Sequence, residues 1–312
     1  KEMIRSMVID ILQGQKQEMA SSQPIKQAPR GQVEPGVFDT VDEAIQAAKA
    51  AQARFEDCTL ATREKVIADI RAAMRPRVQE LAQKTVDETG MGRVADKVLK
   101  LNLTLNKTPG VEDLVTECET GDNGMTLYEL SAYGVIGAIT PSTNPAETLI
   151  CNSIGMLAAG NAIFFSVHPG AKNLSRELVS ELNQVIAKSI GIENLIVTLR
   201  EPSIESAQEM MLHPDVSLLV VTGGPGVVKQ ALQSGKKVIG AGAGNPPAFV
   251  DETADIKKAA QDIVLGASLD NNILCIAEKS VVAMRQIEPQ LVQEMVKAGC
   301  ILVENQQDIQ RL

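Results

Sequence analysis

Apolar and polar positions alternate along most of the chain with the two periods of regular secondary structure. Helical spacing, with an apolar residue every three to four positions, predicts helices at 146–159, 172–190, 204–212 and 227–233. Short β-branched and apolar runs predict strands at 134–139, 162–167, 195–199, 216–222, 237–239 and 248–250. Strands that alternate with helices predict an α/β fold, with a parallel sheet covered by helices on both faces. Ligands of such a sheet bind at the carboxyl ends of its strands.

Helical spacing also dominates before the first of these strands. Thr40-Val41-Asp42-Glu43 has the spelling of a capping box ahead of a helix at 44–55. We interpret the helices of this region as scaffold without chemistry of their own. Gly121-Asp122-Asn123-Gly124 predicts a turn, and strands are expected after it at 125–130 and 133–140.

Residues 1–13 form a separate pattern, in which one apolar stripe runs along a short predicted helix. The stripe consists of Met3, Ile4, Met7, Val8, Ile11 and Leu12. Residues 14–36 are rich in Gln, Pro, Ser and Lys and predict a flexible linker. A helix of about a dozen residues is marginal alone in water, so its stripe requires a partner surface. The sequence leaves open whether that surface belongs to another protein, to another subunit or to the chain's own domain.

Composition excludes several classes of function. The composition, with 44% hydrophobic residues, is that of a globular protein, and a length of 312 residues is enough for two domains. The net charge of -9 provides no basic surface for nucleic acid or an anionic membrane. No apolar stretch is long enough to span a bilayer. The five cysteines form no C-x-x-C pair and indicate unpaired thiols. With only two histidines and no acidic cluster at ligand spacing, no metal site is expected.

Cys275 lies at the end of a polar loop between a helical pattern at 255–269 and a β-branched run at 280–284. Rigid scaffolds commonly place reactive groups on such connections. We interpret Cys275 as a catalytic nucleophile. The alternative is a buried structural thiol, since free cysteine is among the most buried residue types.

The residues that directly follow the predicted strands are polar or loop-forming. They are Thr140-Pro141-Ser142-Thr143-Asn144-Pro145, His168-Pro169-Gly170, Glu201-Pro202 and Gly223-Gly224-Pro225-Gly226. Gly223 and Gly224 open a helix, where bare N–H groups can face a phosphate, although glycine is also ordinary turn chemistry at this place. Gly240, Gly242 and Gly244 lead into two prolines and do not form the dinucleotide fingerprint.

The order of these motifs resembles the aldehyde dehydrogenase superfamily. The resemblance rests on the loop after residue 139, on Val221-Thr222-Gly223-Gly224, on Gly240-Ala241-Gly242-Ala243-Gly244-Asn245-Pro246-Pro247 and on the Cys275 loop. Three further motifs are similar to its CoA-acylating branch, the propionaldehyde and acetaldehyde dehydrogenases of bacterial propanediol and ethanolamine microcompartments. These motifs are Glu88-Thr89-Gly90-Met91-Gly92, Thr108-Pro109-Gly110-Val111-Glu112 and Gly121-Asp122-Asn123-Gly124.

The resemblance implies a Rossmann-like, NAD-binding domain with N-terminal helices at 37–252, followed by the start of a second α/β domain, the catalytic domain, at 253–312. A domain of this kind runs on the order of 150 residues. We therefore expect the catalytic domain to be truncated at Leu312.

The resemblance also assigns roles to residues. Cys275 attacks the aldehyde carbon, and the Asn144 amide and the Cys275 N–H hold the oxyanion. The NAD contacts implied are Thr140, Pro141, Ser142, His168, Gly170, Pro202, Thr222, Gly223, Gly224 and Gly242. Gly170 and Ala171 stand where many relatives carry a ribose-binding glutamate, so the sequence does not decide between NAD and NADP. We expect NAD, because it is the usual cofactor of the family.

Gly240 stands where members that hydrolyse the thioacyl intermediate carry a glutamate base. Without that base, the thiol of coenzyme A is the better nucleophile, because a thiol pKa of about 8.5 leaves part of it as thiolate. The implied reaction is the oxidation of a short-chain aldehyde, propionaldehyde or acetaldehyde, with NAD and CoA to acyl-CoA and NADH. The alternatives are a hydrolytic aldehyde dehydrogenase and a non-catalytic nucleotide-binding component that serves microcompartment assembly.

The family context extends to partners and location. It implies that residues 1–13 target the enzyme to a microcompartment shell protein, so the expected location is the bacterial cytoplasm, inside such a compartment. It also implies a homo-oligomer, a dimer or tetramer, in which the strands at 125–140 pair across subunits.

Overall fold

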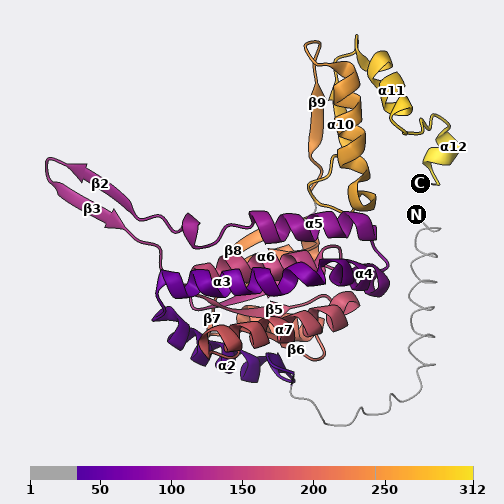
Figure 1. Ribbon diagram of the computed structural model, residues 1–312. Coiled ribbons are helices and arrows are strands. Elements are labelled where there is room, and N and C mark those ends of the chain that lie inside the picture. The colour runs from indigo at the N-terminus through magenta and orange to yellow at the C-terminus, as the bar shows by residue number, and fades with distance from the viewer. Residues whose placement is uncertain (1–33, 243, 312) are drawn as a thin grey trace, which may run out of the picture. The chain divides into compact units, whose positions relative to one another are not determined.

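The computed structural model (Figure 1) describes residues 34–242 and 244–311. The helix predicted at residues 1–13 and most of the linker predicted at 14–36 lie outside the described residues. None of the described helices is long and apolar enough to cross a membrane.

Six parallel strands form the main sheet, in the spatial order β1-β6-β5-β4-β7-β8. Their bounds are Val37–Phe38 (β1), Val135–Ile139 (β4), Ala162–Ser166 (β5), Ile196–Leu199 (β6), Val216–Thr222 (β7) and Lys237–Ala241 (β8). Every residue of β4 and β5 is buried, because a parallel sheet covered on both faces hides continuous apolar runs. The α/β fold predicted from the sequence is confirmed.

Helices cover both faces of the sheet. The chain passes from β4 to β5 and β6 in one direction, then returns to add β7 and β8 on the other side of β4. Since such crossovers are right-handed, the helices after β4 and β5 lie on the face opposite those after β6 and β7. On one face α3 packs outside α6 and α7 (Figure 1). On the other face α2 packs against α8. The bounds are Val41–Glu56 (α2), Leu60–Met74 (α3), Pro145–Ala158 (α6), Lys172–Ile190 (α7), Ile204–Leu212 (α8) and Pro225–Gln233 (α9).

Helices α4 (Val78–Thr89) and α5 (Val94–Lys107) join through a short glycine turn. Gly90 ends α4 in the left-handed conformation, with φ 66°. Gly92 also has a positive φ, of 80°, and a Cβ on it would lie 2.1 Å from Asp270 Oδ1. Glycine at this position therefore lets the turn approach a residue that lies much later in the sequence.

Strands β2 (Glu117–Gly121) and β3 (Gly124–Tyr128) form an antiparallel hairpin that is exposed along its whole length. The predicted turn at Asp122-Asn123 connects them, and the strand expected at 125–130 corresponds to β3. The sequence pattern missed β2, because its residues Glu-Cys-Glu-Thr-Gly carry no apolar alternation. Its pairing with β3 across the two-residue turn makes it a strand.

The C-terminal residues form a second, small sheet. β9 (Pro247–Val250) pairs in parallel with β10 (Ser280–Ala283), and the helices α10 (Ile256–Ser268) and α11 (Glu288–Lys297) follow them in the chain. A separate buried cluster of Val250, Ala260, Ile263 and Leu291 holds this part together. The strand predicted at 248–250 forms, but the expectation that it joins the main sheet is wrong. A period-two pattern identifies a strand without identifying its partner.

Candidate active site

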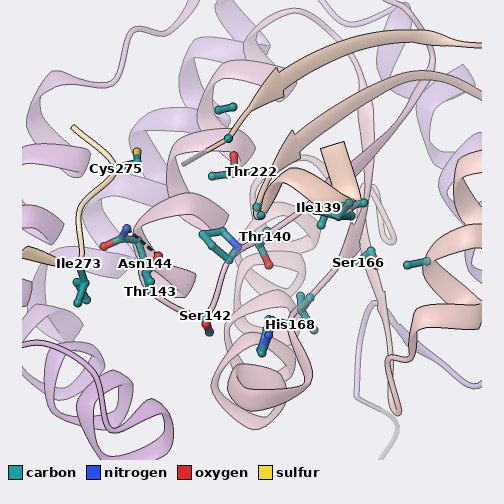
Figure 2. Close-up of a pocket in the computed structure, with 18 of the residues that line it drawn as sticks. Ile139, Thr140, Ser142, Thr143, Asn144, Ser166, His168, Thr222, Ile273 and Cys275 are labelled. Carbon is teal, nitrogen blue, oxygen red and sulfur yellow. Dashed lines mark hydrogen bonds between the residues drawn. The ribbon is translucent and has the colours of Figure 1, made fainter. Parts of the chain in front are cut away.

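A cavity of about 460 Å³ opens at the carboxyl ends of β4 and β7. The strand order reverses between these two strands, since the chain adds β5 and β6 on one side of β4 and β7 on the other. Ligands of open α/β sheets bind at such a switch point. The loops that follow the strands and the segment that carries Cys275 line the cavity (Figure 2).

The cavity brings together residues that lie far apart in the sequence. The predicted site residues that line it are Thr140, Pro141, Ser142, Asn144, His168, Thr222, Gly223, Gly224, Gly242 and Cys275. Gly170 and Pro202 are not among its lining residues. Gly170 instead donates its N–H to Nδ1 of His168 (3.0 Å), and Pro202 precedes Ser203, which does line the cavity.

Other lining residues carry no motif that could have marked them in the sequence. Ile139, Ile204, Val227 and Ile273 supply apolar walls. Such positions read as ordinary core in a hydrophobic pattern, so the sequence reasoning missed them. Among the described residues that line the cavity there is one lysine, Lys279, and no aspartate or glutamate.

Cys275 is exposed at the wall of this cavity, which excludes the alternative of a buried structural thiol. The short helix η4 (Leu269–Asn272) precedes it, and three successive residues there have positive φ. Asp270, Asn271 and Asn272 have φ of 50°, 56° and 60°. Asp and Asn tolerate this left-handed region better than other residues with a side chain, although it still costs about 1 kcal/mol or more per residue. The surroundings must therefore hold the loop in place.

Side-chain hydrogen bonds hold the ends of the Cys275 segment. The Asn272 amide donates to the carbonyl oxygens of Ala267 (2.5 Å) and Glu278 (3.1 Å). On the other side, the Lys279 ammonium donates to the carbonyl of Leu274 (2.8 Å). These bonds close the segment upon itself, so the thiol lies on a turn with a defined backbone.

Asn144 precedes the first turn of α6 at the same cavity. Its backbone carbonyl accepts hydrogen bonds from the N–H (3.1 Å) and the hydroxyl (2.7 Å) of Thr148. Its Nδ2 donates to Oγ1 of Thr143 (3.2 Å), and its Oδ1 accepts from the Lys100 ammonium. In the view of Figure 2, Asn144, Ile273 and Cys275 lie at one end of the cavity, and His168 lies at the other.

A buried charged cluster lies behind the cavity. Lys97 and Lys100 of α5, Glu147 of α6 and Asp270 of η4 are all at most 9% exposed. The Lys97 ammonium lies 3.0 Å from Asp270 Oδ2, and the Lys100 ammonium donates to the same oxygen and lies 3.2 Å from Glu147 Oε1. Two positive and two negative groups make the cluster neutral.

Helix α5 therefore contacts the residues behind the cavity, which the interpretation of the N-terminal helices as scaffold did not anticipate. A signal was present in the sequence. Lys97 is one turn from Leu101, and Leu101 is one turn from Leu105, so the lysine continues a stripe of buried leucines. A lysine on an apolar helix face requires a buried partner. No pattern could identify that partner as Asp270, which lies 173 and 170 residues later in the chain than Lys97 and Lys100.

The pKa values in the cluster follow from burial and from these contacts. Burial lowers the pKa of Lys97. Burial also acts to lower the pKa of Lys100, but Glu147 and the hydrogen bond to Asp270 outweigh it, so that pKa is raised. Burial alone would raise the pKa of Asp270. Hydrogen bonds from Lys100, from the N–H of Arg93 and from Lys97 outweigh it and hold the pKa below its usual 3.8.

Asp270→Asn is expected to destabilise the chain by about 3–5 kcal/mol at pH 7, because it leaves the two buried lysines without their shared carboxylate. The folded pKa of Asp270 is lowered, so its stabilisation is complete above pH 3.8 and is lost as the pH falls through the folded pKa. Urea unfolding of the parent chain and of Asp270→Asn between pH 7 and pH 2 measures this stabilisation. The difference in free energy of unfolding is expected to shrink at the acid end; a difference that is the same at every pH contradicts the ion-pair account.

Comparison with known proteins agrees with the fold and the site. The model of the aldehyde dehydrogenase family matches residues 11–308, and the chain belongs to this family. It is 52% identical to a protein of Salmonella typhimurium named propanal dehydrogenase (CoA-propanoylating), over 86% of this chain and 58% of the relative. The predicted resemblance to the CoA-acylating branch is confirmed.

Two solved structures are similar to the chain. A propionaldehyde dehydrogenase from the fucose utilisation microcompartment of Clostridium phytofermentans is 49% identical, with a TM-score of 0.85, over 88% of this chain and 64% of that one. A propionaldehyde dehydrogenase of Rhodopseudomonas palustris, with bound CoA and an acylated cysteine, is 49% identical, with a TM-score of 0.86, over 89% of this chain and 64% of that one. The chain thus spans about three fifths of the length of these proteins.

Proposed function

We propose that the chain carries the cofactor-binding domain and the nucleophile of a CoA-acylating aldehyde dehydrogenase. The reaction oxidises propionaldehyde or acetaldehyde with NAD and CoA to acyl-CoA and NADH. The observation that carries this proposal is the exposed Cys275 thiol at the switch-point cavity, in one wall with Asn144 and the strand-end loops. The names of the relatives, which describe acylating enzymes, support it.

The first step is attack of the Cys275 thiolate on the aldehyde carbon, which forms a C–S bond and places a negative charge on the former carbonyl oxygen. Two donors are available for that oxygen. One is the Asn144 amide. The other is the backbone N–H of Cys275, which donates to no acceptor within residues 34–242 and 244–311. Donors of this kind stabilise the oxyanion more in the transition state than the neutral carbonyl in the ground state.

The strand ends fit a nicotinamide dinucleotide. A Cβ on Gly224 or on Gly242 would meet no atom within 4 Å, so the backbone at these two positions is open to a ligand. Gly224 caps α9, a helix of nine residues, without a side-chain hydrogen bond. A helix N-terminus of this kind attracts a pyrophosphate. A nicotinamide dinucleotide held by these residues would supply the hydride acceptor, and Cys275 would keep the thioacyl group.

The acyl group then leaves Cys275 for the CoA thiol. The CoA thiolate attacks the thioester carbon, the bond to Cys275 breaks, and the Cys275 thiolate returns. No carboxylate among the described residues lines the cavity, so water lacks a carboxylate base there. The Nδ1 of His168 is already engaged, because it accepts the N–H of Gly170. This chemistry favours CoA over hydrolysis.

Incubation of the chain with propionyl-CoA tests the proposal without a nicotinamide cofactor. The reverse of the last step is expected to place one propionyl group on Cys275, which peptide mass spectrometry detects. Cys118 and Cys151 are also exposed and serve as internal controls. Equal labelling of the three thiols would show that Cys275 has no special reactivity, and the proposal would fail.

The proposal includes a setting for the whole protein. A relative comes from a bacterial microcompartment, so residues 1–13 are proposed to target the enzyme to a shell protein inside the bacterial cytoplasm. Fusion of these residues to a fluorescent protein in shell-forming cells tests this, and diffuse fluorescence would contradict it. The exposed hairpin, with Met125 70% and Leu127 57% accessible, is proposed to pair across subunits of a dimer or tetramer.

A further inference from the structure

Lys100 contacts both halves of the catalytic arrangement. Its ammonium donates to Oδ1 of Asn144, in the loop after β4, and to Oδ2 of Asp270, in the segment that leads to Cys275. The side chain extends from α5, which lies outside the sheet. One buried cation therefore joins the oxyanion donor and the nucleophile segment.

The chemistry of the ammonium fixes the orientation of the Asn144 amide. An ammonium has three donors and no acceptor, so only the oxygen of the amide can face it. The amide nitrogen then points away from Lys100 and holds a hydrogen bond to Oγ1 of Thr143 at 3.2 Å. Asn144 lines the cavity, and its nitrogen is the group that an oxyanion requires. A charged donor on Oδ1 also polarises the amide and strengthens its N–H groups as donors.

Asp270 connects Lys100 to the segment that leads to Cys275. Its Oδ1 accepts the N–H of Arg93 (2.8 Å), and its own N–H donates to Asp96 Oδ2 (2.9 Å), so the start of the Cys275 segment is fixed to the beginning of α5. The Lys97 ammonium also lies 3.0 Å from Asp270 Oδ2, and it donates to the backbone carbonyl of Thr143. Unlike Lys100, Lys97 has no hydrogen bond to the Asn144 side chain.

We propose that Lys100 is a positioning residue for the acyl transfer. It orients the Asn144 amide toward the oxyanion and, through Asp270, fixes the position of that amide relative to Cys275. The inference rests on the proposed function, because the oxyanion belongs to the acylation of Cys275. A purely structural ion pair would stabilise the fold without a specific effect on oxyanion chemistry.

The test uses the whole chain and two reactions of the same thiol. Alkylation by iodoacetamide forms no oxyanion, whereas acylation by propionyl-CoA does. Lys100→Met is made together with Glu147→Gln, which removes one positive and one negative charge and keeps the buried cluster neutral, so the variant avoids an unpaired buried charge. Lys97→Met with Glu147→Gln is the matched control, since it keeps the cluster equally neutral, and the parent chain is the reference.

Removal of Lys100 is expected to slow acylation of Cys275 by about 100-fold, as removal of an oxyanion donor does, while alkylation changes by less than about threefold. Asn144→Ala is expected to slow acylation by a similar factor. Because Lys100 acts through Asn144, the combined variant is expected to be no slower than Asn144→Ala alone. Removal of Lys97 is expected to have a smaller effect that multiplies with that of Asn144→Ala.

The outcomes separate the two claims. If Cys275 of the parent chain is acylated and the effects of Lys100→Met and Asn144→Ala multiply, Lys100 does not act through Asn144 and the inference is overturned, although the proposed function stands. Equal loss of alkylation and acylation would indicate a general disturbance and would also overturn it. If the parent chain is not acylated at Cys275, both the proposed function and the inference fail.

Discussion

Cys275→Ser is expected to slow the exchange of labelled CoA into propionyl-CoA by at least about 1,000-fold, since this exchange passes through the thioacyl group on that residue. Serine keeps the size of the side chain but is scarcely ionised at neutral pH, so it does not replace a thiolate. Exchange needs no nicotinamide and therefore isolates the acyl-transfer half of the reaction.

Cys118→Ser is the matched control, because Cys118 is also exposed but lies on β2, away from the cavity. Its exchange rate is expected to remain within about twofold of the parent rate, as is usual for exposed sites without a special contact. Residual exchange in Cys275→Ser close to that of Cys118→Ser would place the nucleophile elsewhere.

Gly244→Ala is expected to slow the same exchange by about 100-fold. A Cβ at Gly244 would lie 2.2 Å from the backbone carbonyl oxygen of Cys275, a distance that only a shift of the nucleophile segment can relieve. Displacement of a reacting group by about 1 Å costs on the order of 100-fold in rate. Glycine at position 244 is thus required by the close approach of two backbones.

Gly155→Ala provides the control for the glycine substitution. Gly155 lies within α6, and a Cβ there would meet no atom within 4 Å. The exchange rate is expected to stay unchanged and the chain to gain about 0.5–1 kcal/mol of stability, measured by urea unfolding, because alanine favours the helix. If Gly244→Ala behaves like Gly155→Ala, the close contact with Cys275 does not constrain the site.

The periodic parts of the fold are predictable, since each depends on local pattern. The helix at 172–190 and the strand at 216–222 have the predicted bounds. The place of the site at the carboxyl edge of the sheet follows from the same information, because polar residues after successive parallel strands meet at one edge of a sheet. This argument groups Thr140 and Thr222 at one edge, whereas Cys275 is added to the site by the family resemblance alone.

Contacts between distant segments are not predictable from pattern. β9 pairs with β10 and not with the main sheet, and β2 is a strand only because β3 pairs with it. The buried partner of Lys97 and Lys100 is Asp270, and the sequence pattern carries no information about that pairing. Gly92 and Gly244 similarly read as loop glycines, whereas the structure shows that each makes room for a neighbouring segment.

The central claim is that the thioacyl group on Cys275 passes to CoA and not to water. The most direct measurement is NADH formation from propionaldehyde, with and without CoA, by the chain extended with the C-terminal part of the Salmonella typhimurium relative. The account predicts sustained turnover only when CoA is present, because the cavity offers water no carboxylate base among its described residues. Turnover at the same rate without CoA would contradict it, and would mean that another residue activates water.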